Sequence, residues 1–264
     1  MTRLLALLSA LLLSAAPALA GTPFSSGFEG GSDAGSCATT GWDGETDTGN
    51  DMELDDDGPV LRGSFACKLV MNDTTTSTLL ESSSLTAESE IWVTFYIFIV
   101  SGGTYVDANA FQLLQVRDNA SLDDEGNVSF RQVDTSTYWG ATGMAENDDA
   151  SQVTTSRGNV MQAGRWYCFE YNQQEASSST ANNGELTMYV DGRLQGWSTS
   201  LDNNGNDLSE IRLGDTGGLD ATPAMTIYFD EVTVGDAGTR PGCTAGINKR
   251  GDPEDDELPL GSEG

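Results

Sequence analysis

Histidine is absent from this sequence, and lysine occurs only twice, as Lys68 and Lys249. The lack of histidine excludes Ser-His-Asp triads, histidine general bases and histidine metal ligands. Arginine and lysine together number 12 against 41 aspartates and glutamates, which gives a formal net charge of −29. Because a nucleic-acid partner needs a basic face for its phosphates, this excess of acid excludes nucleic acid as a natural partner. It also disfavours anionic membrane surfaces.

Long hydrophobic runs are scarce as well. The run Leu4–Leu13 follows Arg3 and precedes Ala18-Leu19-Ala20, a pattern that predicts a signal peptide over residues 1–20. The run is too short for a transmembrane helix, and no later stretch approaches the roughly 18 apolar residues that a span needs. Loss of this segment would remove Arg3 and change the net charge from −29 to −30. We therefore expect a secreted, extracellular protein, with the periplasm as the alternative location and without membrane insertion.

Helical periodicity is missing after the signal peptide, whereas short strand-like segments recur between Gly-, Asn-, Asp- and Ser-rich turns. Asp191-Gly192 is typical of a tight hairpin turn between two of them. These features predict an all-β fold, a two-sheet antiparallel sandwich or jelly roll, over residues 21–247. Residues 248–264 hold an acidic run and few core residues, which predicts a disordered acidic tail. The fourteen predicted strands are Phe24–Glu29, Asp51–Leu54, Ser64–Met71, Thr78–Ser82, Glu90–Val100, Ala110–Arg117, Asn127–Val133, Thr137–Thr142, Gln152–Thr155, Arg165–Gln173, Gly184–Val190, Arg193–Ser198, Glu210–Leu213 and Ala224–Val234.

The sequence has four cysteines but no C-x-x-C pair, so a zinc site is disfavoured. In an exported chain, four cysteines most simply form two disulfides, for which three connectivities are possible. We favour Cys37–Cys67 and Cys168–Cys243, because each of these bonds would attach a loop-rich end of the chain to a strand.

Three stretches together carry a resemblance to a known family. They are Phe28-Glu29-Gly30-Gly31, then Gly164–Glu170 followed by Gly184–Gly192, and finally Ile227–Val232. Their order resembles the concanavalin-A-like jelly rolls, and within them the secreted polysaccharide-lyase-like branch that includes glucuronan lyases. The resemblance implies two stacked antiparallel sheets, one of which bends into a concave groove that often holds a glycan. We therefore expect a polysaccharide partner.

Side-chain alternation suggests which residues would line such a groove. Gln115 and Arg117 share one face of their strand, and Arg131 and Glu170 each lie opposite apolar neighbours on theirs. If these strands are neighbours, the four residues and Tyr96 would meet on the concave sheet and bind a polar or uronic-acid glycan. Arg117 and Arg131 would then contact a carboxylate by bidentate hydrogen bonds. The alternative is that all are ordinary solvent-facing residues of a half-exposed sheet.

Catalysis is the less favoured interpretation. A lyase needs a group that neutralises the uronate and a base that removes a proton, and Gln115 or Arg117 with Tyr138 or Tyr96 could serve. Hydrolysis needs paired acids, and the segment Glu53–Gly58 begins like a glucanase signature but has glycine where the last acid should stand. We therefore predict a non-catalytic glycan-binding protein. The alternatives are a polysaccharide lyase acting by β-elimination and a structural or surface-associated module without glycan binding.

A structural calcium ion is the predicted cofactor. Asp230 shares its strand face with apolar residues, and a carboxylate buried there must be paired or bound. The resemblance implies that calcium sits between the first and last strands on acids matching Glu29 and Asp230, with a further ligand near Ser64. Calcium prefers such oxygen ligands. The alternative is that Glu29 is solvated and Asp230 accepts backbone N–H bonds.

Overall fold

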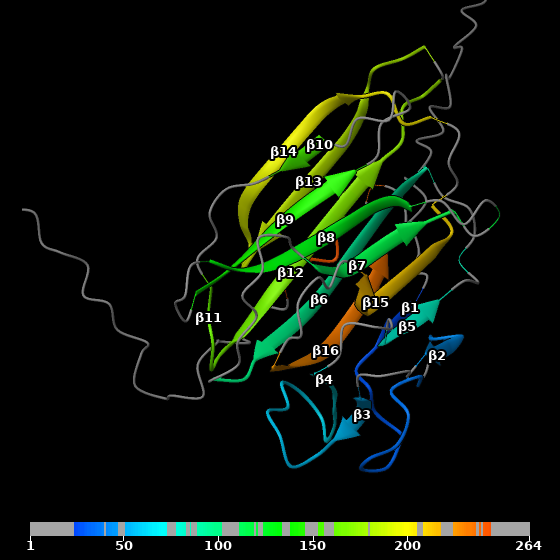
Figure 1. Ribbon diagram of the computed structural model, residues 1–264. Helices are drawn as coiled ribbons and strands as arrows, with labels where there is room; N and C mark the ends of the chain where they lie inside the picture. Colours follow the sequence, from blue (N-terminus) through cyan, green and yellow to red (C-terminus); the bar gives the residue numbers. More distant parts are fainter. Residues whose placement is uncertain are drawn as a thin grey trace, which may run out of the picture.

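In the computed structural model, the residues described here are 24–39, 41–46, 51–72, 78–82, 85, 89–101, 111–118, 120, 124–133, 138–145, 153–155, 161–178, 180–204, 208–217, 224–235, 238 and 240–243 (Figure 1). The predicted signal peptide and the predicted acidic tail lie outside these residues. Over the described part of the chain there is no helix, and hence none long and apolar enough to cross a membrane.

The first of two antiparallel sheets, called sheet A here, has eight strands. Its order is β14-β13-β12-β6-β16-β4-β3, and β1 pairs with β16 in addition. The strands of sheet A are β1 (Phe24–Ser26), β3 (Asp51–Asp55), β4 (Ala66–Met71), β6 (Glu90–Ile99), β12 (Trp166–Gln174), β13 (Gly184–Val190), β14 (Arg193–Leu201) and β16 (Met225–Gly235).

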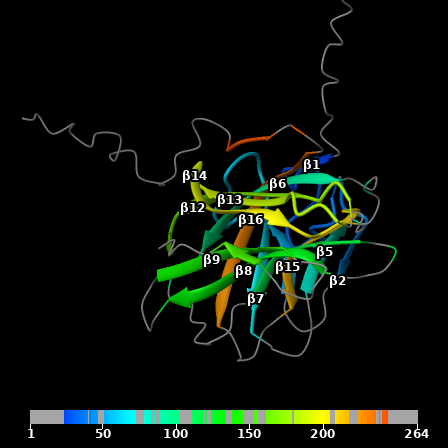
Figure 2. The same cartoon turned by 90° about the horizontal axis from the view of Figure 1, so that it is seen from above.

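The second sheet, sheet B, also has eight strands and lies against sheet A as the other layer of a sandwich (Figure 2). Its order is β10-β9-β8-β7-β15-β5-β2, and β11 pairs with β9 in addition. The strands of sheet B are β2 (Gly44–Thr46), β5 (Thr78–Ser82), β7 (Phe111–Arg117), β8 (Asp124–Val133), β9 (Tyr138–Ala145), β10 (Val153–Thr155), β11 (Met161–Gln162) and β15 (Glu210–Gly217).

The all-β sandwich confirms the predicted fold class. Each of the fourteen predicted segments coincides with a strand, within a few residues at its ends. The two strands that the sequence did not predict, β2 and β11, are only three and two residues long. Two or three residues alone carry too little alternation to be recognised. Strands β1 and β10 are equally short, but they lie inside the longer predicted segments Phe24–Glu29 and Gln152–Thr155.

The hydrophobic core lies between the two sheets. In β6 the odd-numbered side chains Ile91, Val93, Phe95, Ile97 and Ile99 are each at most 1% exposed, as the alternation of this strand predicts. The ring of Phe95 stacks on that of Phe169 in the neighbouring strand β12, with centroids 5.2 Å apart. Sheet B contributes a matching set of buried apolar side chains, namely Leu80, Leu114, Val116, Val128, Phe130, Ile211 and Leu213. The face of each sheet that is turned away from this core is called its outer face below.

The hairpin between β13 and β14 has the predicted turn. Asp191 and Gly192 have φ angles of 51° and 71°, the positive values that a two-residue hairpin loop requires. The side chain of Asp191 accepts the backbone N–H of Cys168 at 3.0 Å, so the turn is also tied to β12.

Both favoured disulfides are present, which confirms the predicted connectivity. Cys37–Cys67 joins the N-terminal segment to β4 across a sequence separation of 30 residues. Cys168–Cys243 joins the C-terminal segment to β12 across 75 residues. In each case a segment outside the central strands is attached to a buried strand.

Candidate functional site

A row of polar side chains crosses the outer face of sheet B. The strand register aligns Glu81 on β5 with Arg212 on β15, Arg212 with Gln115 on β7, and Gln115 with Asn127 on β8. The residues before and after each of these positions are largely apolar and belong to the core, so alternation turns the row away from it. Strands β5, β15, β7 and β8 thus place one continuous polar row on this face.

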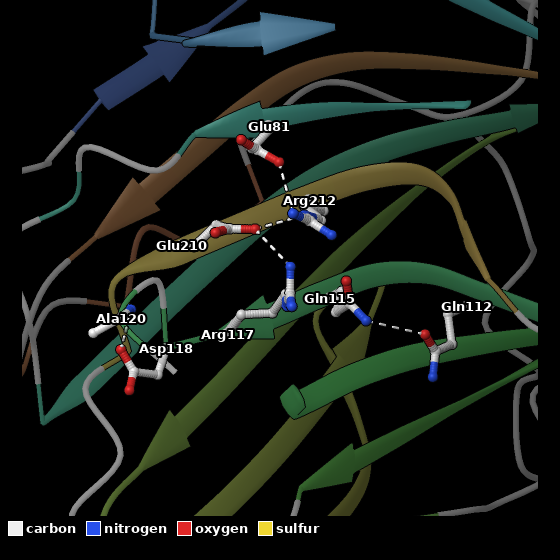
Figure 3. Close-up of polar contacts among 8 residues, drawn as sticks. All are labelled: Glu81, Gln112, Gln115, Arg117, Asp118, Ala120, Glu210 and Arg212. Atoms are coloured by element: carbon white, nitrogen blue, oxygen red, sulfur yellow. Dashed lines mark hydrogen bonds and ion pairs between the residues drawn. The ribbon is translucent and has the colours of Figure 1, made fainter. Parts of the chain in front are cut away.

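Two arginines and two glutamates form the charged end of the row (Figure 3). Arg212 lies 2.8 Å from Glu81, between its Nη2 and the glutamate Oε2, and its Nε also contacts Glu210. Arg117 Nη1 lies 3.3 Å from the same Glu210 Oε1. The Glu210 side chain is 1% exposed, whereas the side chains of Arg212 and Glu81 are 24% and 33% exposed. The solvent-accessible part of the cluster is therefore the Arg212–Glu81 pair.

Uncharged amides and hydroxyls continue the row. Gln115 Nε2 donates to Gln112 Oε1 at 3.4 Å, and Ser129 Oγ donates to Asn127 Oδ1 at 2.8 Å. These amides and hydroxyls are buried, since Gln115 is 5%, Asn127 3% and Ser129 6% exposed. The solvent-accessible groups of the row are therefore the Arg212 guanidinium and the Glu81 carboxylate, whose charges are balanced within the protein. Such a surface suits a ligand rich in hydroxyl groups, which donate and accept hydrogen bonds.

Of the predicted glycan-binding residues, the structure brings only Gln115 and Arg117 together on this row. Arg131 aligns with Gly140, four residues along β8 from Asn127, or about 13 Å at the rise of a strand. The position of Tyr138 on β9 is six residues from Met144, the partner of Asn127, or about 20 Å. The side chains of Arg131 and Tyr138 lie outside the described residues.

Tyr96 and Glu170 belong to the other sheet, so the expectation that they join Gln115 and Arg117 on one sheet is wrong. Tyr96 on β6 aligns with Cys168 on β12, and both face outward from sheet A. Tyr96 and Glu170 are both buried on that face, because Tyr96 is 3% exposed and Glu170 is 0% exposed. Alternation predicted their strand faces correctly, but it carries no information about which strands are neighbours.

Glu170 is covered by the C-terminal segment, residues 240–243. Arg240 contacts its carboxylate through two nitrogens, at 2.7 Å and 2.6 Å, and Cys243 of the nearby disulfide lies beside it. These hydrogen bonds to Glu170 raise the pKa of Arg240. The guanidinium also lies 3.7 Å from the centroid of the Tyr189 ring. Glu170 therefore anchors this segment to sheet A.

The residues predicted to bind calcium converge on one loop, residues 61–65. Oε1 of Glu29 accepts the backbone N–H of Ser64 at 2.8 Å, and a Cβ at Gly63 would overlap this carboxylate. Oδ2 of Asp230 accepts two backbone N–H bonds from the start of the loop, at 2.9 Å and 3.1 Å. Burial raises the pKa of Asp230 to about 7, and the backbone N–H bonds act in the opposite direction. Both acids therefore contact the same loop by accepting its backbone N–H groups, and a calcium ion there stays a prediction.

Sequence reasoning missed Arg212, Glu81 and Glu210. A signal for two of them existed, because Glu210 and Arg212 are two apart in a predicted strand and therefore share a face. Their importance depends on Arg117 and Glu81, which come from β7 and β5 on either side of β15. That arrangement could not be inferred without the strand order.

No protein-family model matches the sequence, and no curated protein sequence matches it. Among solved structures, the chain is similar to "Cellulose induced protein, Cip1", with a TM-score of 0.55 and 18% identity over 83% of this chain and 99% of that one. It is also similar to alginate lyase Aly36B in complex with alginate trisaccharide, with a TM-score of 0.49 and 8% identity over 65% of this chain and 81% of that one. A third likeness is to the botulinum neurotoxin type G receptor binding domain, with a TM-score of 0.49 and 13% identity over 84% of this chain and 48% of that one. At 18% identity, the first likeness shows the jelly-roll fold that the sequence motifs imply.

Proposed function

We propose that the protein is an exported, non-catalytic glycan-binding β-sandwich whose polysaccharide site is the outer face of sheet B. The observation that carries this proposal is the polar row Glu81–Arg212–Gln115–Asn127, placed on the face turned away from the core. Arg212 and Glu81 present a guanidinium and a carboxylate at the surface, and the amides of Gln115 and Asn127 lie buried beside them. Sugar hydroxyls pair with both kinds of group, and arginine hydrogen bonds to ligands are strong and directional. The name of the similar cellulose-induced protein adds general support for a carbohydrate role.

Export is supported by the two disulfides together with the predicted signal peptide. Disulfides persist in oxidising compartments and are rare in the cytosol. A polysaccharide outside the cell is a substrate or surface that such a protein would meet.

The preference for binding over catalysis rests on the positions of the tyrosines. Elimination needs a base beside the group that neutralises the substrate carboxylate. Tyr96 lies in the opposite sheet from Gln115 and Arg117, and Tyr138 lies about 20 Å along its strand from their row, by the rise per residue. Glu81 and Glu210 also already balance the charge of the two arginines. The lyase alternative would be supported only if the wild type forms unsaturated product in the experiment described next.

Arg212→Gln is expected to lower the affinity for the bound polysaccharide by roughly ten-fold or more, because a charge-assisted hydrogen bond to the ligand is lost. The measurement is retention on a panel of neutral and uronic-acid polysaccharides, with absorbance of unsaturated product followed in parallel. Arg165→Gln is the matched control, since it removes the same charge from a partly exposed side chain paired with Asp191. Melting temperatures check that both variants are folded.

The outcomes separate the candidate functions. Unsaturated product formed by the wild type would replace this proposal with the lyase alternative. Equal retention of Arg212→Gln and wild type would place the glycan elsewhere. If the wild type binds no polysaccharide, the remaining alternative is a structural or surface-associated module without glycan binding.

Calcium is the cofactor in this proposal, held by Glu29, Asp230 and the loop 61–65. The donor chemistry fits, because two carboxylates and the Ser64 hydroxyl are oxygen ligands of the kind that calcium prefers. A cation there would also offset the desolvation that disfavours ionised Asp230. When bound, it would join the start of the sandwich to its last strand, since Glu29 follows β1 and Asp230 lies in β16.

Calcium at a hundred times its Kd is expected to raise the free energy of unfolding by about 2.7 kcal/mol. For a chain of this size, that corresponds to a melting temperature raised by roughly 5–10 °C. Thermal unfolding with calcium and with a chelator measures the shift, and Asp230→Asn should abolish it. A shift that persists in the variant would place the ion elsewhere. If the wild type shows no shift, calcium does not bind there, and the backbone N–H bonds alone stabilise the buried Asp230 carboxylate.

A further inference from the structure

The outer face of sheet A carries an exposed tryptophan. Within the described ranges, the large hydrophobic side chains that are exposed are Trp197, at 59%, and Leu194, at 48%, both on β14. Single exposed apolar residues are common on protein surfaces and need no explanation. Leu194, however, lies beside an aromatic side chain, because the register pairs it with Tyr189 on β13.

A second cross-strand row begins at this tryptophan. The register aligns Trp197 with Thr187 on β13, Thr187 with Asn172 on β12, and Asn172 with Trp92 on β6. Core residues alternate with Thr187 and Trp92 on β13 and β6, and Asn172 and Trp197 share their face through the strand register. Three strand spacings separate the two tryptophans, or about 14 Å. The row is therefore long enough for several linked sugar rings.

The inner part of this row is held by hydrogen bonds. The carboxylate of Glu90 accepts both the indole N–H of Trp92, at 3.0 Å, and the amide of Asn172, at 3.1 Å. The other oxygen of Glu90 accepts the backbone N–H of Gly238 at 3.1 Å. The Trp92 ring is also stacked beside the Tyr189 ring, with centroids 6.5 Å apart. The polar edge of Trp92 is thus satisfied within the protein, and the orientation of its ring is set.

We infer that this row, Trp92–Asn172–Thr187–Trp197, is a second binding surface for a neutral polysaccharide. A pyranose ring has an apolar C–H face and hydroxyl edges, which match the rings of Trp92 and Trp197 and the Thr187 hydroxyl between them. Asn172 is 5% exposed and donates to Glu90 and to the Ile91 carbonyl, so it supports the row from beneath. A protein partner would instead favour a continuous apolar centre, which Asn172 and Thr187 interrupt. Glu90 and the exposed Glu185 flank the row in a chain of net charge −29, so an anionic glycan is disfavoured. This surface goes beyond the proposed site on sheet B, because the two outer faces lie on opposite sides of the sandwich (Figure 2).

The test uses amorphous cellulose and cellohexaose as neutral β-glucan probes, with polygalacturonate as the anionic comparison. Trp197→Ala is expected to weaken retention on cellulose by about ten-fold or more, because an aromatic anchor is removed. Trp197→Phe should retain part of the binding. Leu194→Ala is the matched control, since it removes an exposed apolar side chain from the same strand without removing a ring. All three changes lie at exposed positions, where substitutions cost little stability.

Tryptophan fluorescence gives an independent measurement. Cellohexaose should change the emission of the wild type, and Trp197→Ala should remove most of that change. Failure of the wild type to bind either neutral probe would overturn the inference, as would equal binding by Trp197→Ala. A concentration-dependent dimer that Trp197→Ala abolishes would also overturn it, because a second copy would then cover the row. Arg212→Gln, on sheet B, should leave cellulose retention by this surface unchanged. The two variants therefore test the sheet A inference and the sheet B proposal independently.

Discussion

Reduction of both disulfides is expected to lower the free energy of unfolding by roughly 8 kcal/mol in the chain-entropy account. The bond Cys37–Cys67, with a sequence separation of 30, contributes about 3.5 kcal/mol of this, and Cys168–Cys243, with a separation of 75, about 4.5 kcal/mol. Such a loss is comparable to the entire stability of many domains. Thermal unfolding followed by circular dichroism, with and without a reductant, measures the effect.

Paired cysteine-to-serine variants separate the two bonds. Removal of Cys168–Cys243 should be the more destabilising change, because it opens the longer loop and also frees the segment whose Arg240 covers Glu170. Titration of native protein should detect no free thiol. Four reactive thiols in folded material, or a melting temperature unaffected by reductant, would contradict this prediction.

Arg240→Ala is expected to destabilise the protein by about 3 kcal/mol, because it leaves a buried carboxylate without its counter-charge; the 37% exposure of Arg240 places the loss at the low end for a buried pair. Glu170 is 0% exposed and receives two hydrogen bonds from Arg240, at 2.7 Å and 2.6 Å. Glu170→Gln in the same chain should recover part of the loss, since a neutral amide is cheaper to bury than an unpaired charge. Denaturant unfolding of the two single variants and the double variant measures this coupling.

Arg165→Ala is the matched control for Arg240→Ala. Arg165 also forms an ion pair, with Asp191 at 3.0 Å, and also lies over an aromatic ring, that of Tyr167 at 4.1 Å. Both partners of its ion pair are more than one third exposed, so this change should cost at most about 1 kcal/mol. Equal losses for the two variants would show that the burial of Glu170 does not govern the effect.

Local patterns in the sequence determined the strands and their faces. The alternation in Glu90–Ile99 predicted which side chains of β6 are in the core, and Asp191-Gly192 predicted the hairpin turn. These features depend on residues close together in the chain, where side-chain period and positive φ are local properties. The cysteine pairing was also predictable, because each bond attaches a loop-rich end to a strand. The all-β sandwich followed from many such segments and the lack of a helical period.

Only the tertiary structure decided which of these faces meet. Arg117 and Arg212 are adjacent because β15 lies between β7 and β5, an order that no local pattern specifies. For the same reason Glu170, predicted to line a groove with Gln115, lies in the other sheet beneath Arg240. The period of two along a strand assigns a side chain to one of two faces but is the same whichever strand lies alongside. Neighbours across a sheet are set by the packing of the whole sandwich core, and both polysaccharide surfaces proposed here are built from such neighbours.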